Sequence, residues 1–180
     1  MKQIQKNIGL GCADFNFAVY IGNTPTMPEY QDLSALNALV DGEMNSIGLV
    51  CGNGWRKVFN IYAKLLYGLD KNNFGFSQLA PIWQQYRDSF LLQSGSNTAL
   101  LFSPPLIDPD ANKYHIICGK TYAKQLLDSG KLEARLNWLD EEFAVDKKHR
   151  LIVCPYFDYR QLSNIKIERL AKLLGQFPNS

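Results

Sequence analysis

Histidine is scarce in this sequence, and no cysteines stand at the spacing of a metal site. The chain of 180 residues has two histidines, His115 and His149, and four widely separated cysteines without a C-x-x-C motif. Zinc sites and the disulfide frameworks of small secreted proteins both depend on closely spaced cysteine or histidine residues. The sequence therefore predicts no metal site and no cofactor, and we expect the cysteines to be free thiols.

Long apolar runs and a strong net charge are also absent. No window approaches the roughly 20 apolar residues of a transmembrane helix, and the first segment, MKQIQKNIGLGCADF, lacks the apolar core of a signal peptide. We therefore expect a cytoplasmic protein that does not enter a membrane. The 19 basic and 17 acidic side chains leave a net charge of +2. Affinity for nucleic acid would therefore require a local cluster of lysine and arginine residues.

Length and apolar content indicate one α/β domain over residues 1–180. Apolar runs predict strands at 15–21, 46–51, 99–102, 114–118 and 150–154. Periodic or helix-like segments predict helices at 32–40, 55–67, 76–93, 119–130, 131–143 and 164–175. Continuous apolar strands that alternate with helices are typical of a parallel sheet buried on both faces. The predicted fold is a three-layer α/β/α sandwich with a mainly parallel sheet of about five strands.

Three of these strands end alike. LVCGNGWRKVF at 49–59 and IICGKTYAKQL at 116–126 both carry Cys-Gly, an aromatic residue and Lys at matching positions, and IVCP at 152–155 repeats the beginning. The carboxyl ends of parallel strands meet at one edge, where open α/β folds bind ligands. We therefore expect Cys51, Cys118 and Cys154 at that edge. Small apolar packing residues are the favoured interpretation, and a redox or metal-binding thiol cluster is the alternative.

Histidine catalysis is not expected at this carboxyl edge. His115 and His149 stand at the start of predicted strands, and so at the opposite edge of the sheet. This placement argues against Ser-His, Cys-His and His-metal chemistry together.

The residues predicted at the carboxyl edge suit an anion. Helices beginning near Gly54 and Lys120 would direct unpaired backbone N–H groups and the positive end of the helix dipole into a crevice. Basic and aromatic side chains complete the predicted ligand-binding set, which is Gly22, Asn53, Gly54, Arg56, Lys57, Lys120, Tyr156, Tyr159 and Arg160. We therefore expect a phosphate-containing ligand, either a nucleotide or nucleic acid. A purely structural role of the two glycine turns is the alternative.

A carboxylate in the last loop is a candidate catalyst. Asp158 lies among Tyr156, Phe157, Tyr159 and Arg160. This side chain could act as a general base or orient a water molecule. The alternative is that it caps a turn, as aspartate does in many surface loops.

The order and spacing of VYIGNTP, ALLFSPP, YHIICGKTYAKQL and RLIVCPYFDYRQLS, before a terminal helix, are similar to the uracil-DNA glycosylase superfamily over 15–174. The chain also looks like a member of an uncharacterised bacterial family with a CGNGWRK segment. The resemblance implies a glycosylase-like fold in which Asn23 positions water.

One position departs from the superfamily's pattern. Cys154 stands where the loop histidine is expected, and Pro155 and Tyr156 follow it. Loss of this histidine would remove the group that stabilises the departing base. Ligand binding without catalysis is therefore the favoured function. A divergent nucleobase-releasing DNA glycosylase or a related nucleotide hydrolase is the alternative.

Overall fold

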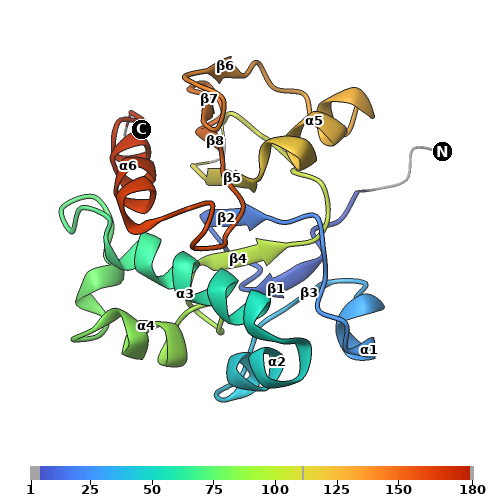
Figure 1. The fold of residues 1–180 in the computed structure, drawn as a ribbon, viewed down its shortest axis with the longest axis vertical. Helices are drawn as coiled ribbons and strands as arrows, with labels where there is room; N and C mark the ends of the chain where they lie inside the picture. Colours follow the sequence, from blue (N-terminus) through green and yellow to red (C-terminus); the bar gives the residue numbers. More distant parts are fainter. Residues whose placement is uncertain (1–4, 111, 179–180) are drawn as a thin grey trace.

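An eight-stranded mixed sheet forms the centre of the computed structural model, which describes residues 5–110 and 112–178 (Figure 1). The strands are β1 (Gly9–Gly11), β2 (Phe17–Tyr20), β3 (Leu36–Asn37), β4 (Thr98–Leu101), β5 (Tyr114–Cys118), β6 (Asn137–Trp138), β7 (Ala144–Asp146) and β8 (Leu151–Cys154). Their order across the sheet is β3-β1-β4-β2-β5-β8-β7-β6.

The central strands β4, β2, β5 and β8 are parallel to one another. Flanking strands reverse the direction, because β1 is antiparallel to β4 and β7 is antiparallel to β8. The predicted α/β class is confirmed. The predicted sheet of about five mainly parallel strands has too few strands, and its strands run too uniformly in one direction, because the observed sheet has eight strands and is mixed. The additional strands are two or three residues long, too short to give a recognisable apolar run.

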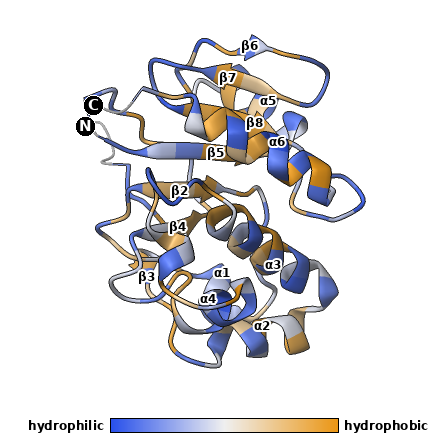
Figure 2. Ribbon diagram, turned by 90° about the vertical axis from the view of Figure 1, so that its left-hand side faces the viewer, coloured by the Kyte–Doolittle hydropathy of each residue, from blue (hydrophilic) through white to orange (hydrophobic). Residues whose placement is uncertain are grey.

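Helices cover both faces of the sheet. They are α1 (Pro28–Gln31), α2 (Glu43–Cys51), α3 (Asn53–Tyr67), the 3-10 helix η1 (Phe76–Gln78), α4 (Trp83–Ser89), α5 (Lys120–Asp128) and α6 (Asn164–Gly175). Hydropathy follows this arrangement, with apolar strands and helices that alternate between apolar and polar residues (Figure 2). In the described part of the chain, none of the helices combines the length and the hydropathy needed to cross a membrane.

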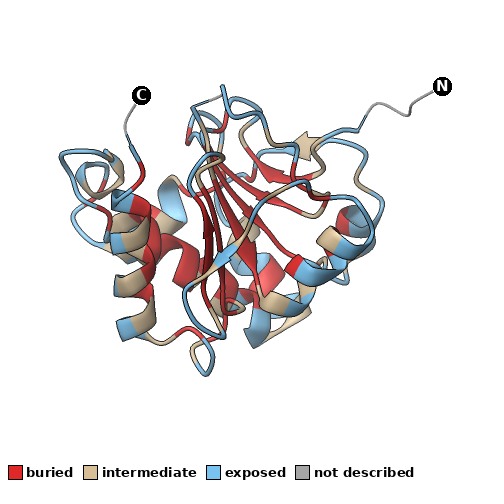
Figure 3. Cartoon of the chain, turned by 90° about the horizontal axis from the view of Figure 1, so that it is seen from above, coloured by how far each residue is buried: buried red, intermediate tan, exposed pale blue. Residues whose placement is uncertain are grey.

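The sheet separates two apolar cores, and its central strands are buried between them (Figure 3). Alternate residues of each strand point to opposite faces, so Phe17 and Val19 pack in the larger core while Ala18 and Tyr20 pack in the smaller one. Residues of α2, α3, α4 and α6 contribute to the larger core, and residues of α5 to the smaller one.

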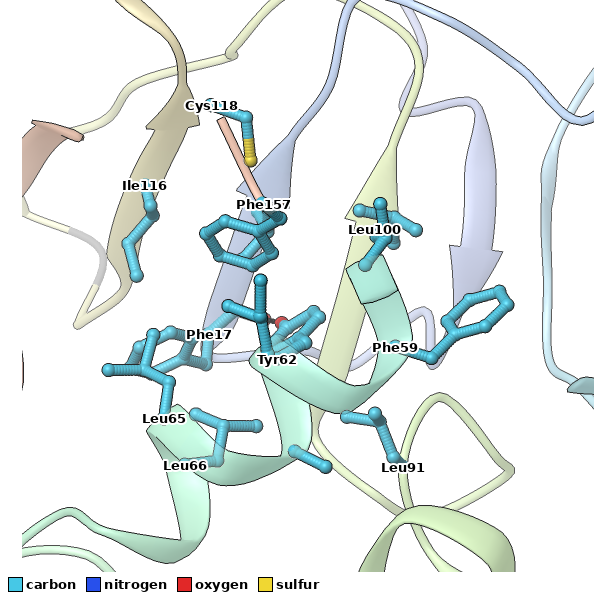
Figure 4. Packing of buried hydrophobic residues seen from close by; sticks show 14 of the residues in the cluster. Phe17, Phe59, Tyr62, Leu65, Leu66, Leu91, Leu100, Ile116, Cys118 and Phe157 are labelled. Carbon is cyan, nitrogen blue, oxygen red and sulfur yellow. Dashed lines mark hydrogen bonds between the residues drawn. The ribbon is translucent and has the colours of Figure 1, made fainter. Parts of the chain in front are cut away.

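Helix α3 supplies the centre of the larger core. Its apolar side chains recur at helical spacing and face the sheet, where Tyr62 packs among Phe17, Leu100 and Phe157 (Figure 4). The hydroxyl group of Tyr62 is fully buried, and it donates a hydrogen bond to the carbonyl oxygen of Ala99 at 2.9 Å. The buried polar group is thereby satisfied.

Four predicted elements were wrong. Residues 46–51 belong to helix α2 rather than to a strand, and Leu49 and Val50 on it are 64% and 65% exposed. Residues 32–40 contain β3 instead of a helix, and 131–143 contain β6 and a turn held by Asp140, whose Oδ1 accepts the N–H groups of Glu142 and Phe143. The helix predicted over 76–93 is divided into η1 and α4, on either side of Pro81, which cannot donate a helical hydrogen bond.

Candidate functional site

A cavity of about 400 Å³ opens at the carboxyl ends of β2, β5 and β8. Its lining residues follow these strands or belong to the turn between β6 and β7: Gly22, Asn23, Cys118, Gly119, Lys120, Thr121, Tyr122, Gln125, Glu141, Glu142, Pro155, Tyr156 and Gln161. The parallel arrangement of the three strands accounts for this convergence, because their loops leave the sheet at the same edge. We call this space the carboxyl-edge cavity.

The N-terminus of α5 forms one wall of the carboxyl-edge cavity. Gly119 turns the chain from β5 into this helix with φ 96°, a conformation that favours glycine, and its N–H donates to the carbonyl oxygen of Cys154 at 2.7 Å. In the described structure no side chain caps the helix, and Ala123 is the first residue whose N–H bonds back to Gly119. The preceding N–H groups therefore have no acceptor within the helix.

Asn23 and Tyr156 meet beside this helix end. The Tyr156 hydroxyl donates a hydrogen bond to Oδ1 of Asn23 at 3.1 Å, which joins the loop after β2 to the loop after β8. Burial raises the pKa of Tyr156, so this phenol is a neutral donor at physiological pH. Gly22 allows the loop after β2 to approach α5 closely, because a Cβ atom there would lie 3.1 Å from Cδ2 of Tyr122.

The cysteines at this edge are buried thiols. Cys118 and Cys154 are paired positions of the neighbouring strands β5 and β8. Burial raises the pKa of both thiols well above the ordinary value, so neither forms a thiolate at neutral pH. Their placement agrees with packing residues, whereas Cys51 does not join them, because it ends helix α2.

Charges of both signs surround the carboxyl-edge cavity. The ammonium group of Lys120 lies 5.1 Å from the centre of the Trp138 ring. Glu141 and Glu142 also line the cavity, and Glu142 forms an ion pair with Lys166 at 2.8 Å. The cavity lining thus carries a cation at the first residue of α5 and carboxylates from the turn between β6 and β7.

Asp158 belongs to a separate ionic cluster that does not line the carboxyl-edge cavity. Its carboxylate accepts hydrogen bonds from the backbone and the guanidinium group of Arg160, and Lys57 Nζ lies 3.6 Å away. The hydrogen bonds from Arg160, together with the charge of Lys57, lower the pKa of Asp158 well below its usual range. The carboxylate is therefore ionised at neutral pH and held by two cations.

The remaining predicted binding residues also lie outside this cavity. Arg56 packs on Gly48 of α2 and lines a different pocket of about 230 Å³ beside α4. The ring of Tyr159 contacts Lys64, whose Nζ lies 4.6 Å from the ring centre. Asn53 and Gly54 are exposed at the start of α3. The structure thus brings Lys120 together with Gly22, Asn23 and Tyr156, but not with Arg56 or Arg160.

Comparison with known protein families gives a match for the chain. Residues 8–175 match a family of unknown function, DUF6942. The chain belongs to this family. Every strand and helix of the described DUF6942 structure, from β1 to α6, falls within the matched range. No curated protein and no solved structure matches the chain.

Several lining residues of the DUF6942 cavity were not predicted from the sequence. Tyr122 and Gln125 lie on the first turns of α5, shortly after the Gly-Lys pair that was identified. Helical spacing after that pair was the available signal. Glu141 and Glu142 gave no signal, because they were assigned to a helix that the structure does not contain.

Proposed function

We propose that this DUF6942 protein binds a small phosphate-containing ligand of nucleotide size in the carboxyl-edge cavity. The observation that supports the proposal is the uncapped N-terminus of α5, which opens into a cavity that Lys120 also lines. Free N–H groups at a helix N-terminus favour an anion, and the helix dipole adds to that preference. A cavity of about 400 Å³ is within the range of small-molecule sites.

The carboxylate of Glu141 on the cavity lining favours a nucleotide over nucleic acid. A polynucleotide would extend past Glu141, which repels neighbouring phosphate groups, whereas one nucleotide can be held between α5 and the Asn23–Tyr156 pair. Glu142 adds little to this repulsion, because Lys166 neutralises its charge. The rings of Tyr122 and Tyr156 offer apolar surface for a base or sugar. Nucleic acid binding usually requires a continuous basic surface, and the predicted basic residues are divided between separate clusters.

Catalysis is a second candidate function, and the Asn23–Tyr156 hydrogen bond supports it. In a nucleotide hydrolase or nucleobase-releasing glycosylase, Asn23 would orient the attacking water molecule. The hydrogen bond from Tyr156 would fix the side-chain amide of Asn23. Asp158 is the weaker catalytic candidate, because its carboxylate is occupied by Arg160 and Lys57 outside the cavity. Cys154 supplies no charged group there, because burial keeps its thiol neutral.

Titration with inorganic phosphate, adenosine monophosphate and uridine monophosphate tests the binding proposal. We expect amide resonances of Lys120 and Thr121 to shift, and Lys120→Ala to weaken binding roughly tenfold because a charge-assisted contact is lost. Lys124→Ala is the matched control, since Lys124 is exposed on the same helix and does not line the cavity. Absence of shifts at the start of α5 at millimolar ligand would contradict the proposal.

The contribution of the backbone can be measured separately. Lys120→Pro removes the same ammonium group and one N–H donor as well, and proline is tolerated at the first position of a helix. We expect Lys120→Pro to bind phosphate more weakly than Lys120→Ala. Equal affinities of the two variants would mean that this N–H group does not contact the anion.

Turnover assays test the catalytic alternative. Release of a base from nucleotides or from uracil-containing DNA by the wild type, and its loss in Asn23→Ala, would support an enzyme. Phosphate binding that persists without any turnover would leave binding as the function of the cavity.

A further inference from the structure

A second cavity, of about 530 Å³, lies at the amino edge of the sheet, opposite the carboxyl-edge cavity. Its walls include Phe17 and Tyr114, the first residues of β2 and β5, and Phe74 and Phe76 from the segment that follows α3. The length of β5, five residues or roughly 16 Å, separates the two edges. A ligand of nucleotide size therefore does not occupy both cavities. We call the second one the amino-edge cavity.

Its aromatic residues form a connected wall. The Phe17 and Tyr114 rings are stacked with centroids 5.7 Å apart, and Phe74 meets Tyr114 edge-on at 5.2 Å. Phe76 contacts Phe17 edge-on at 6.2 Å. Rings that hold one another in this way keep their orientation without a ligand, which lowers the entropic cost of binding a flat molecule.

Amide side chains stand beside the aromatic wall. Asn97 has φ 60°, and its carbonyl oxygen accepts the N–H groups of Asn16 and Phe17 at 3.0 and 3.3 Å, which fixes the loops before β4 and β2 against each other. In the described structure the side-chain amides of Asn16 and Asn97 have no hydrogen-bond partner. Both therefore offer one donor group and one acceptor.

Asn112 adds a third amide from the loop before β5. Its Oδ1 accepts a hydrogen bond from Arg150, whose guanidinium group also donates to the carbonyl oxygen of Pro178 and lies 5.4 Å from the Tyr114 ring centre. Arg150 thus fixes both Asn112 and Tyr114, and the amide nitrogen of Asn112 keeps its donors.

The lack of charged side chains among the described residues that line the amino-edge cavity favours an uncharged ligand. Among the described residues that line this cavity, none is acidic, basic or histidine. An anion or a cation would lose its hydration there without a counter-charge. We propose that the amino-edge cavity binds an uncharged planar heterocycle of the nucleobase kind, whose faces pack on the half-buried rings of Phe74, Phe76 and Tyr114 and whose polar edge bonds to Asn16, Asn97 and Asn112.

Amide side chains match this ligand because they can donate to and accept from the edge of a base at the same time. An uncharged sugar would satisfy the amides but would use the aromatic faces less fully, since its hydroxyl groups surround the ring. The proposal does not rest on the proposed phosphate site, because the two cavities share no lining residue.

Protein-observed NMR with adenine and uracil, each compared with glucose, tests the assignment. We expect amide shifts at Asn16, Asn97 and Tyr114 with either base, and a dissociation constant that rises roughly tenfold or more in the double variant Asn16→Ala/Asn97→Gly. Glycine at 97 keeps the positive φ accessible, so the loop is retained. Asn23→Ala, at the carboxyl edge, is the control that should bind both bases as the wild type does.

A second variant distinguishes loss of binding from loss of the fold. Gly75 lines the amino-edge cavity at φ −86°, and a Cβ atom there would meet no atom within 4 Å, so Gly75→Leu adds bulk without backbone strain. We expect this variant to melt as the wild type does and to exclude both bases. Base binding that survives in Gly75→Leu, preferential binding of glucose, or shifts confined to residues 119–122 would overturn the assignment.

Discussion

The imidazole of His115 and the hydroxyl group of Tyr20 lie side by side within the smaller core, with Nδ1 2.7 Å from the tyrosine oxygen. The two rings are stacked with centroids 5.7 Å apart, and both residues are 1% exposed. Tyrosine can donate to Nδ1 only while that nitrogen carries no proton. Burial lowers the pKa of His115 to about 4, with smaller effects of Lys113 and His149.

Stability is expected to fall as the pH decreases from 6.5 to 4. In this window the unfolded chain binds a proton at His115 that the folded protein does not bind, so protonation favours unfolding. The loss is about 3 kcal/mol over the whole window, from 1.36 kcal/mol for each unit of pKa difference. Urea unfolding between pH 4 and 7 measures this loss.

His115→Gln is the variant that isolates this effect. It retains a polar group near Tyr20 and does not titrate, so its stability should depend less on pH than that of the wild type. Asp140 does not interfere, because the hydrogen bond from Arg169 lowers its pKa to about 2 and its contribution is lost only below this window. Identical pH dependence in wild type and variant would show that His115 is not the titrating group.

Two glycines in the CGNG segment should respond oppositely to alanine. Gly52, between α2 and α3, has φ 100° and ψ 178°, so Gly52→Ala is expected to destabilise the fold by about 2 kcal/mol through backbone strain alone. Gly54 lies in the first turn of α3, and Gly54→Ala should stabilise it by about 0.5 kcal/mol. A Cβ atom is unobstructed at both positions. Equal free energies of unfolding for the two variants would refute the difference in backbone conformation.

Lys64 connects three segments through its ammonium group. Its Nζ lies 4.9 Å from the centre of the Trp83 ring on α4 and 4.6 Å from that of Tyr159 in the loop after β8. Lys64→Met keeps the apolar stem and removes the charge, and we expect a loss of about 1 kcal/mol in the free energy of unfolding. Lys71→Met, at an exposed position, is the control. A loss no larger than that of the control would mean that the ring contacts do not stabilise the fold.

Asp158 should affect stability rather than ligand affinity. Its carboxylate holds the loop after β8 through Arg160 and connects that loop to α3 through Lys57. Asp158→Asn is therefore expected to lower the melting temperature while phosphate affinity at α5 stays unchanged. A stable variant that loses turnover would instead indicate a catalytic carboxylate.

The central strands could be predicted because both faces of each are buried. β2, β5 and β8 fall within predicted apolar runs and β4 overlaps one, and their parallel pairing correctly placed Cys118 beside Cys154. The run at 46–51 was misassigned because a six-residue apolar segment has no decisive periodicity. Leu49 and Val50 are exposed on α2, and their apolar side chains gave no indication of that exposure.

The wrong assignment of 46–51 also led to a wrong expectation for the position of Arg56. With 46–51 taken as a strand, Arg56 was expected beside Lys120 at the carboxyl edge, whereas Arg56 lies on α3, packs on Gly48 of α2 and lines the pocket beside α4. The Lys120 region was located because Gly119 does follow a parallel strand. The amino-edge cavity gave no local signal, because its walls come from separate segments between residues 16 and 114 that meet only after folding.

Both ends of the sheet are short. The outermost strands, β3 and β6, are two residues long, so each offers few unpaired backbone groups to another chain. Long exposed edge strands recruit further strands and lead to aggregation, and a short one limits this addition. Each margin of the eight-stranded sheet is therefore a poor template for a further strand.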